Sequence, residues 1–111
     1  MRPIPAEMLT DTVTLEKYRH DIGGRELVFS TMLSSVRIVR CREKEHEHGC
    51  GEDGAKGILY FDARHSRPSG AELLTAGLES DIVQGSDRCG IRGVKYLYDE
   101  RGFHHAEAEL V

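Results

Sequence analysis

The most constraining feature of this chain is an alternation of apolar and polar residues with a period of two, which recurs in several short segments. In the last of them, residues 103–111, one face carries Ala106, Ala108 and Leu110. The other face carries His105, Glu107 and Glu109. Successive side chains of a β-strand point to opposite faces, whereas a helix repeats about every 3.6 residues. The segment is therefore predicted to be a half-buried strand with one solvated side.

Similar alternation, or enrichment in β-branched and aromatic residues, predicts further strands along the chain. Strands are expected at residues 12–18, 26–29 leading into 36–40, 57–62, 81–83, 91–98 and 103–111. Within the first two, the side chains expected to point inward are Val13, Leu15, Val36 and Ile38. Gly23-Gly24 and Gly85-Ser86 separate strand-like segments and suit turns, because glycine adopts positive φ angles without a steric penalty.

The strand pattern favours a mainly β fold. Five to six short strands with little certain helix predict a small single-domain β-barrel or sandwich. At most a short helix is expected near residues 71–78, where Ala, Glu and Leu favour helix. Since 111 residues are about the size of one compact domain, residues 1–111 are expected to share one hydrophobic core.

Residues 42–56 differ in composition from the rest of the chain. They are rich in Glu, His, Lys, Asp and Gly and offer only Cys50 and Ala55 for burial. Such a segment cannot bury enough apolar surface to offset the entropy lost on ordering. We therefore expect a mobile polar loop at residues 42–56.

The segment Gly57–Asp62 is the most hydrophobic part of the chain and is apolar on both faces. That composition indicates a central strand or a strand whose outer face meets a partner. Because a small domain cannot easily bury both faces, we predict that Leu59, Tyr60 and Phe61 lie in or next to a subunit interface.

The charge balance excludes some functions. A sequence-independent nucleic-acid binder draws affinity from Lys and Arg, whereas the formal net charge here is −4. With no apolar run of about 20 residues and no signal-peptide pattern, we expect a soluble cytosolic protein without a membrane partner. The odd number of cysteines, three, argues against a disulfide framework and for reduced thiols.

One cluster has the residue types of a zinc site. Cys41, His46, His48 and Cys50 could supply four tetrahedral ligands. Structural zinc sites usually present two close pairs separated by a dozen or more residues, whereas these four crowd into one segment. The spacing favours a solvated loop, so no metal is expected, and a zinc site remains the alternative.

The adjacent residues His104 and His105, with Glu107, could suggest metal-assisted hydrolysis. Neighbouring residues of a regular strand point to opposite faces, so the two imidazoles would share an ion only if the backbone were irregular there. We therefore expect one histidine to be packed and the other exposed.

No catalytic residue or cofactor site is assigned. A Gly-x-Ser-x-Gly nucleophile elbow is absent from the sequence. The glycine-bounded segment 85–90 lacks the Gly-Lys-Ser/Thr of a phosphate-binding loop, and turn chemistry explains it better. The chain is therefore predicted not to be an enzyme.

A series of segments, taken in order, points to one family. They are Pro3-Ile4-Pro5, Leu9, Thr12-Val13-Thr14, Val36-Arg37-Ile38, Ile58–Asp62, Ser66, Pro68-Ser69-Gly70, Asp81-Ile82, Gly85, Leu97-Tyr98-Asp99, His104-His105, Glu107 and Leu110. This order resembles the small minor capsid proteins of tailed bacteriophages with long non-contractile tails, in the head-to-tail joining group. The likeness runs nearly end to end and is most specific at the C-terminal segment. Residues 41–55 and 71–79 depart from it.

The resemblance implies a virion structural protein at the head–tail junction, present in the host cytoplasm before assembly. Its subunits would form a homo-oligomeric ring, part of the connector that closes the DNA-filled head and receives the tail. Its partners would be the neighbouring connector, portal-adaptor and tail proteins. DNA would pass through the channel without sequence-specific recognition, and acidic channel walls would repel its phosphates.

Two other classes remain open. One is a small metal-binding or hydrolytic domain that uses Cys41, His46, His48 and Cys50 or the His104-His105 pair. The other is a cellular adaptor or ligand-binding β-barrel.

Overall fold

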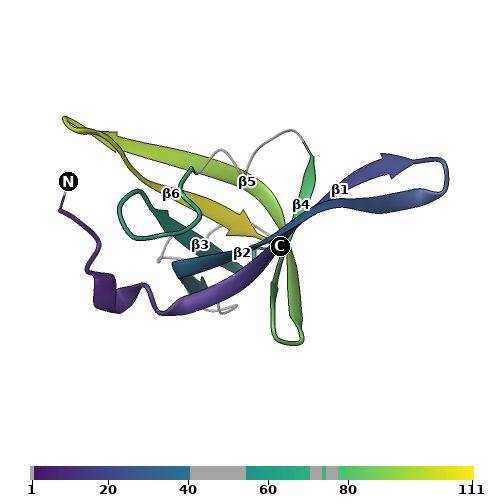
Figure 1. Ribbon diagram of the computed structural model, residues 1–111, viewed down its shortest axis with the longest axis horizontal. Coiled ribbons are helices and arrows are strands. Elements are labelled where there is room, and N and C mark those ends of the chain that lie inside the picture. Colours follow the sequence, from purple (N-terminus) through teal and green to yellow (C-terminus); the bar gives the residue numbers. More distant parts are fainter. Residues whose placement is uncertain (1, 41–54, 71–73, 75–77) are drawn as a thin grey trace.

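A computed structural model describes residues 2–40, 55–70, 74 and 78–111 and shows an antiparallel sheet closed into a barrel (Figure 1). The six strands of the described residues are β1 (Asp11–Asp21), β2 (Gly24–Arg40), β3 (Gly57–Asp62), β4 (Glu79–Gln84), β5 (Asp87–Asp99) and β6 (Gly102–Leu110). A short 3-10 helix, η1 (Ala6–Met8), precedes β1. The predicted mainly β fold is confirmed, and it is a barrel.

The strands follow the order β1-β2-β3-β6-β5-β4 around the barrel, and β4 pairs back with β1 to close it. Every neighbouring pair is antiparallel. The two predicted turns are present. Gly24 (φ 116°) lies at the β1–β2 turn and Gly85 (φ 61°) at the β4–β5 turn, both with backbone angles that favour glycine.

The core fills the barrel interior, mostly with side chains from alternate positions of the strands. It comprises Val13, Leu15, Leu33, Val36, Leu59, Phe61, Leu74, Ile82, Cys89, Ala106, Ala108 and Leu110, with Ile38 packed against it. The inward faces predicted for residues 12–18, 36–40 and 103–111 are therefore correct. Their period of two determined which side chains reached the interior.

Strand β3 lies between β2 and β6, and its bounds coincide with the predicted segment. Leu59 pairs with Ile38 on one side and with Ala108 on the other. The side chains of Leu59 and Phe61 point into the barrel, whereas Ile58 and Tyr60 lie on its outer face and are half-buried. The strand is thus central, and its outer face is only partly covered by the residues described.

Two predicted segments fall mostly outside the described residues. Of the polar loop predicted at 42–56, only Ala55 and Lys56 are described. Of the helix predicted near 71–78, only Leu74 and Leu78 are described. Both remain predictions.

The β1–β2 hairpin projects from the barrel at one end of its longest dimension, 46 Å (Figure 1). Pairing of β1 with β4 stops at Tyr18, and pairing of β2 with β3 begins only at Val36. Between these points the two strands pair with each other down to Asp21 and Gly24. Residues 19–30 are all exposed, so the hairpin extends as a two-stranded ribbon into solvent.

Candidate functional site

The N-terminal arm, residues 2–9, lies across the outer face of the barrel and forms one wall of a groove. Proline at positions 3 and 5 keeps the start of the arm extended, and η1 follows. The buried side chain of Leu9 anchors the arm, and Nη1 of Arg37 donates a hydrogen bond of 3.3 Å to the Met8 carbonyl. Three barrel strands, β2, β3 and β6, form the floor beneath it.

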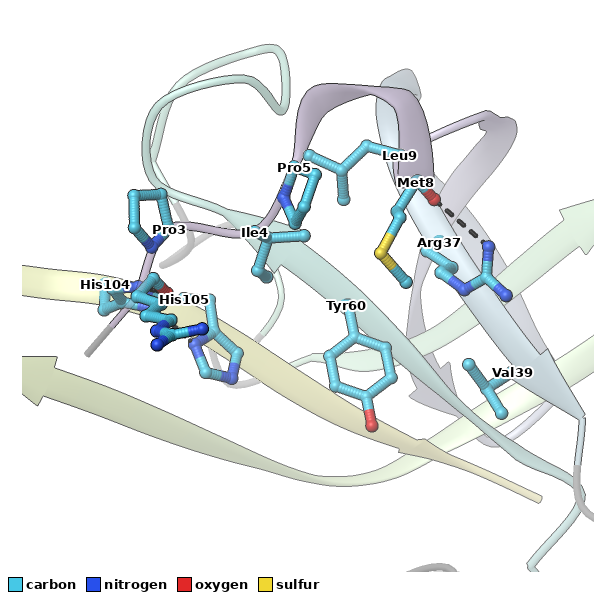
Figure 2. A pocket seen from close by; sticks show the side chains of 11 residues that line it. Pro3, Ile4, Pro5, Met8, Leu9, Arg37, Val39, Tyr60, His104 and His105 are labelled. Carbon is cyan, nitrogen blue, oxygen red and sulfur yellow. Dashed lines mark hydrogen bonds between the residues drawn. The ribbon is translucent and has the colours of Figure 1, made fainter.

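The groove has a volume of about 500 Å³ and a mostly apolar lining. In Figure 2, Pro3, Ile4, Pro5 and Met8 of the arm face Tyr60 and His105 of the barrel across the opening. Arg2 and Arg37 contribute positive charge at its edges. A groove of this size and lining accepts an apolar side chain or a small ligand.

His104 and His105 lie together at one end of the groove, and both are buried. Their Nδ1 atoms are 2.8 Å apart. The prediction that one ring is packed and the other exposed was therefore wrong. The cause is a β-bulge: Leu97 pairs with His105 and Tyr98 with Phe103, which leaves His104 as the extra residue. The irregular backbone brings the side chains of His104 and His105 to the same end of the groove.

The outer nitrogens of the pair complete a chain of hydrogen bonds. Nε2 of His104 lies 2.8 Å from the Arg2 carbonyl oxygen, and Nε2 of His105 lies 2.9 Å from Oε2 of Glu107. A carbonyl and a carboxylate only accept, so both Nε2 atoms must donate. Of the two Nδ1 atoms in contact, one must donate and the other accept.

This chain of contacts ties the arm to β6, because Arg2 belongs to the arm and Glu107 to the strand. Tyr60 stands beside it, with its ring centroid 6.1 Å from that of His105. Burial, and secondarily the charge of Glu107, raises the pKa of the Tyr60 hydroxyl. The described part of the chain contains no group of three or more His, Cys, Asp or Glu arranged to hold a metal ion.

The predicted interface residues separate into two sets. Leu59 and Phe61 are 0% and 1% exposed and belong to the core, so their side chains do not reach the surface of the described chain. Tyr60 lies on the outer face, in the floor of the groove. Of the three residues predicted at a subunit interface, Tyr60 is therefore the one whose side chain lies at the surface of the described chain. Of the candidate zinc ligands Cys41, His46, His48 and Cys50, none lies within the described residues.

A second surface, which the sequence reasoning missed, is the projecting β1–β2 hairpin. Its exposed large apolar side chains are Ile22, Leu27, Val28 and Phe29, and Met32 is exposed on β2 just beyond it. They occupy both faces, because a bulge inserts Val28 between the Lys17–Phe29 and Tyr18–Leu27 pairs. The available signal was the run Leu27-Val28-Phe29, since three consecutive apolar residues cannot all face one core.

Charged groups at the base of the hairpin connect it to the barrel. Oδ2 of the buried Asp81 accepts hydrogen bonds of 2.9 Å from Arg25 and from Arg88. Burial alone would raise the pKa of Asp81, but the two guanidinium groups outweigh it and lower that pKa. Arg25 also lies over the Tyr18 ring, 3.9 Å from its centroid.

Comparison of the chain with protein-family models, with curated protein sequences and with solved structures found no match. No helix in the described ranges is long and apolar enough to span a membrane.

Proposed function

We propose that this chain is a structural subunit of a tailed-phage virion, part of the connector ring that closes the DNA-filled head and receives the tail. The observation that carries the proposal is the projecting hairpin. Ile22 is fully exposed, and Leu27 and Phe29 are 48% and 41% exposed. Contact of several large apolar side chains with water is unfavourable, and a cluster of them on one projecting segment is typical of a surface that binds a partner. Contact with other subunits would bury the hairpin.

The fold suits a subunit of this kind. A closed barrel has no open sheet edge that could pair with another chain, so the barrel itself does not promote aggregation. The hairpin, by contrast, offers apolar side chains together with the backbone edge of β2, which pairs with β3 only from Val36 onward. The barrel thus supplies a rigid support and the hairpin a contact surface.

The electrostatic character is consistent with a DNA channel. The formal net charge of −4 means that a ring of many copies carries a large negative charge. Acidic walls repel phosphates, which favours passage of DNA over binding. The resemblance in order from Pro3-Ile4-Pro5 to the segment 97–110 supports a place at the head–tail junction of the virion.

The experiment is a deletion of the gene in the phage that carries it. Capsids and tails assemble independently in this account, so lysates examined by electron microscopy should contain separate heads and separate tails. Adding the purified protein to such a lysate should restore joined, infectious particles. Normal numbers of complete virions would overturn the proposal, whereas loss of capsids would assign the protein to shell building.

A further inference from the structure

The two surfaces of this chain, the hairpin and the groove, lie at opposite ends of the molecule. Figure 1 shows the β1–β2 turn at one end of the longest axis and the N-terminal arm at the other. The groove beneath that arm is lined by Pro3, Ile4, Met8 and Tyr60. One end thus presents an apolar projection and the other an apolar recess.

We infer that the occupant of the groove is the β1–β2 turn of a second copy of this chain, with Ile22 inserted beside Met8 and Tyr60. The inference rests on the proposed function and gives the ring its lateral contact. Ile22 is the most exposed large apolar residue described, and it lies at the tip where it can enter a recess. A groove of about 500 Å³ has room for such a side chain.

Charge complementarity supports this occupant. Asp21 lies next to Ile22 at the tip, and its carboxylate accepts a hydrogen bond from Gly23 N–H. The groove carries Arg2 and Arg37. Insertion of the turn would bring the carboxylate toward these guanidinium groups, which are well suited to bind it.

The arrangement also fits the symmetry of a ring. A contact between two different patches is heterologous, so each copy uses its hairpin on one neighbour and its groove on the other. In a ring of many subunits the direction changes only slightly from one copy to the next. The two patches must therefore lie at nearly opposite ends of each subunit, and the β1–β2 turn and the N-terminal arm that lines the groove do so here.

A heterologous contact makes a prediction that a two-fold contact does not. Ile22→Glu destroys the hairpin surface and keeps the groove, whereas Met8→Glu does the reverse. Both residues are exposed, so neither change affects the core. Ser86→Glu is the matched control, because it places the same charge in the exposed β4–β5 turn. Circular dichroism and melting temperature establish that all three variants are folded.

Self-association is measured by analytical ultracentrifugation and by NMR relaxation up to about 1 mM, the effective concentration that a template supplies. The wild-type protein and Ser86→Glu should associate. Each of the other variants alone should associate at least about tenfold more weakly, since an apolar contact is replaced by a buried charge. An equimolar mixture of Ile22→Glu and Met8→Glu should form a one-to-one dimer and nothing larger.

Wild-type behaviour of either variant, or a wild-type protein that stays monomeric up to that concentration, overturns the inference. A mixture that remains monomeric also overturns it, because one intact hairpin and one intact groove are present. These outcomes are independent of the deletion phenotype. Separate heads and tails after deletion, together with an unaffected Ile22→Glu protein, would retain the connector role and reject this contact alone.

Discussion

Nη2 of Arg25, on the projecting part of β2, donates a hydrogen bond of 2.9 Å to Oδ2 of Asp81 on β4. The acceptor is buried and the donor is partly exposed, with side-chain exposures of 7% and 35%. Arg88 reaches the same oxygen from β5, also at 2.9 Å. Asp81 therefore connects the projecting part of β2 to the barrel.

The first prediction concerns acid stability through Asp81. Its pKa is lowered in the folded protein, so its contribution is fully present above its unfolded value and is lost as the pH falls through the folded value. Asp81→Asn should destabilise the fold by about 1–3 kcal/mol at neutral pH. The difference from wild type should shrink below about pH 4. Denaturant unfolding at several pH values measures the free energy of unfolding of both proteins. A difference between them that stays constant with pH would contradict the stabilising role of the Asp81 carboxylate.

The second prediction concerns Lys17, whose side chain is 3% exposed. Its Nζ makes no hydrogen bond within the described part of the chain. Burial lowers the pKa of this ammonium group. Lys17→Met keeps the aliphatic chain and removes the charge, so it should stabilise the fold by about 1–3 kcal/mol at neutral pH.

The Lys17 effect on wild-type stability depends on pH in the same direction as the Asp81 effect, because both pKa values are lowered in the folded protein, but the change occurs at alkaline instead of acid pH. The unfolded chain holds the Lys17 proton to a higher pH than the folded chain, so wild-type stability should rise as the pH approaches about 10. The advantage of Lys17→Met should therefore shrink with rising pH. A destabilised Lys17→Met variant would show that the ammonium group has a favourable partner.

The third prediction concerns the arm. His104→Leu keeps the bulk of the ring but removes its hydrogen bonds to the Arg2 carbonyl and to His105. Amide hydrogen exchange in residues 4–9 should accelerate, while the strands keep their protection. The control is His65→Leu, since the side chain of His65 is exposed. Equal exchange in both variants would show that the histidine pair does not hold the arm.

The fourth prediction separates the two parts of β2. Leu33 is fully buried, so Leu33→Ala should cost about 2–5 kcal/mol. Phe29, four residues earlier, is 41% exposed on the hairpin. Phe29→Ser should change the free energy of unfolding much less and should increase solubility. A similar cost for both substitutions would indicate that the hairpin packs on the barrel in solution.

The strand pattern was predictable because burial follows a period of two. The inward faces of residues 12–18 and 103–111 were identified from this period, whereas residues 57–62 were identified from their apolar composition. The sequence did not show how far the hairpin extends, because Leu27 and Phe29 are of residue types that usually lie in a core. Only the pairing of their strands, which ends at Tyr18 on one side and Val36 on the other, reveals their exposure.

The groove could not be predicted for a different reason. Its walls come from the arm and from β2, β3 and β6, which meet only after the barrel closes. The histidine pair depends on a bulge opposite Leu97, and no residue near it marks a bulge in the sequence. A regular strand would place His104 and His105 on opposite faces, but the backbone there is irregular.

The connector role is tested most directly by electron cryomicroscopy of virions of the phage that encodes this chain. The account predicts a ring between portal and tail whose density fits the six-stranded barrel, with each hairpin reaching the next copy. Mass spectrometry of the purified virions should detect the chain in ring stoichiometry. Purified virions that lack the chain, with the junction fully occupied by other proteins, would contradict the account.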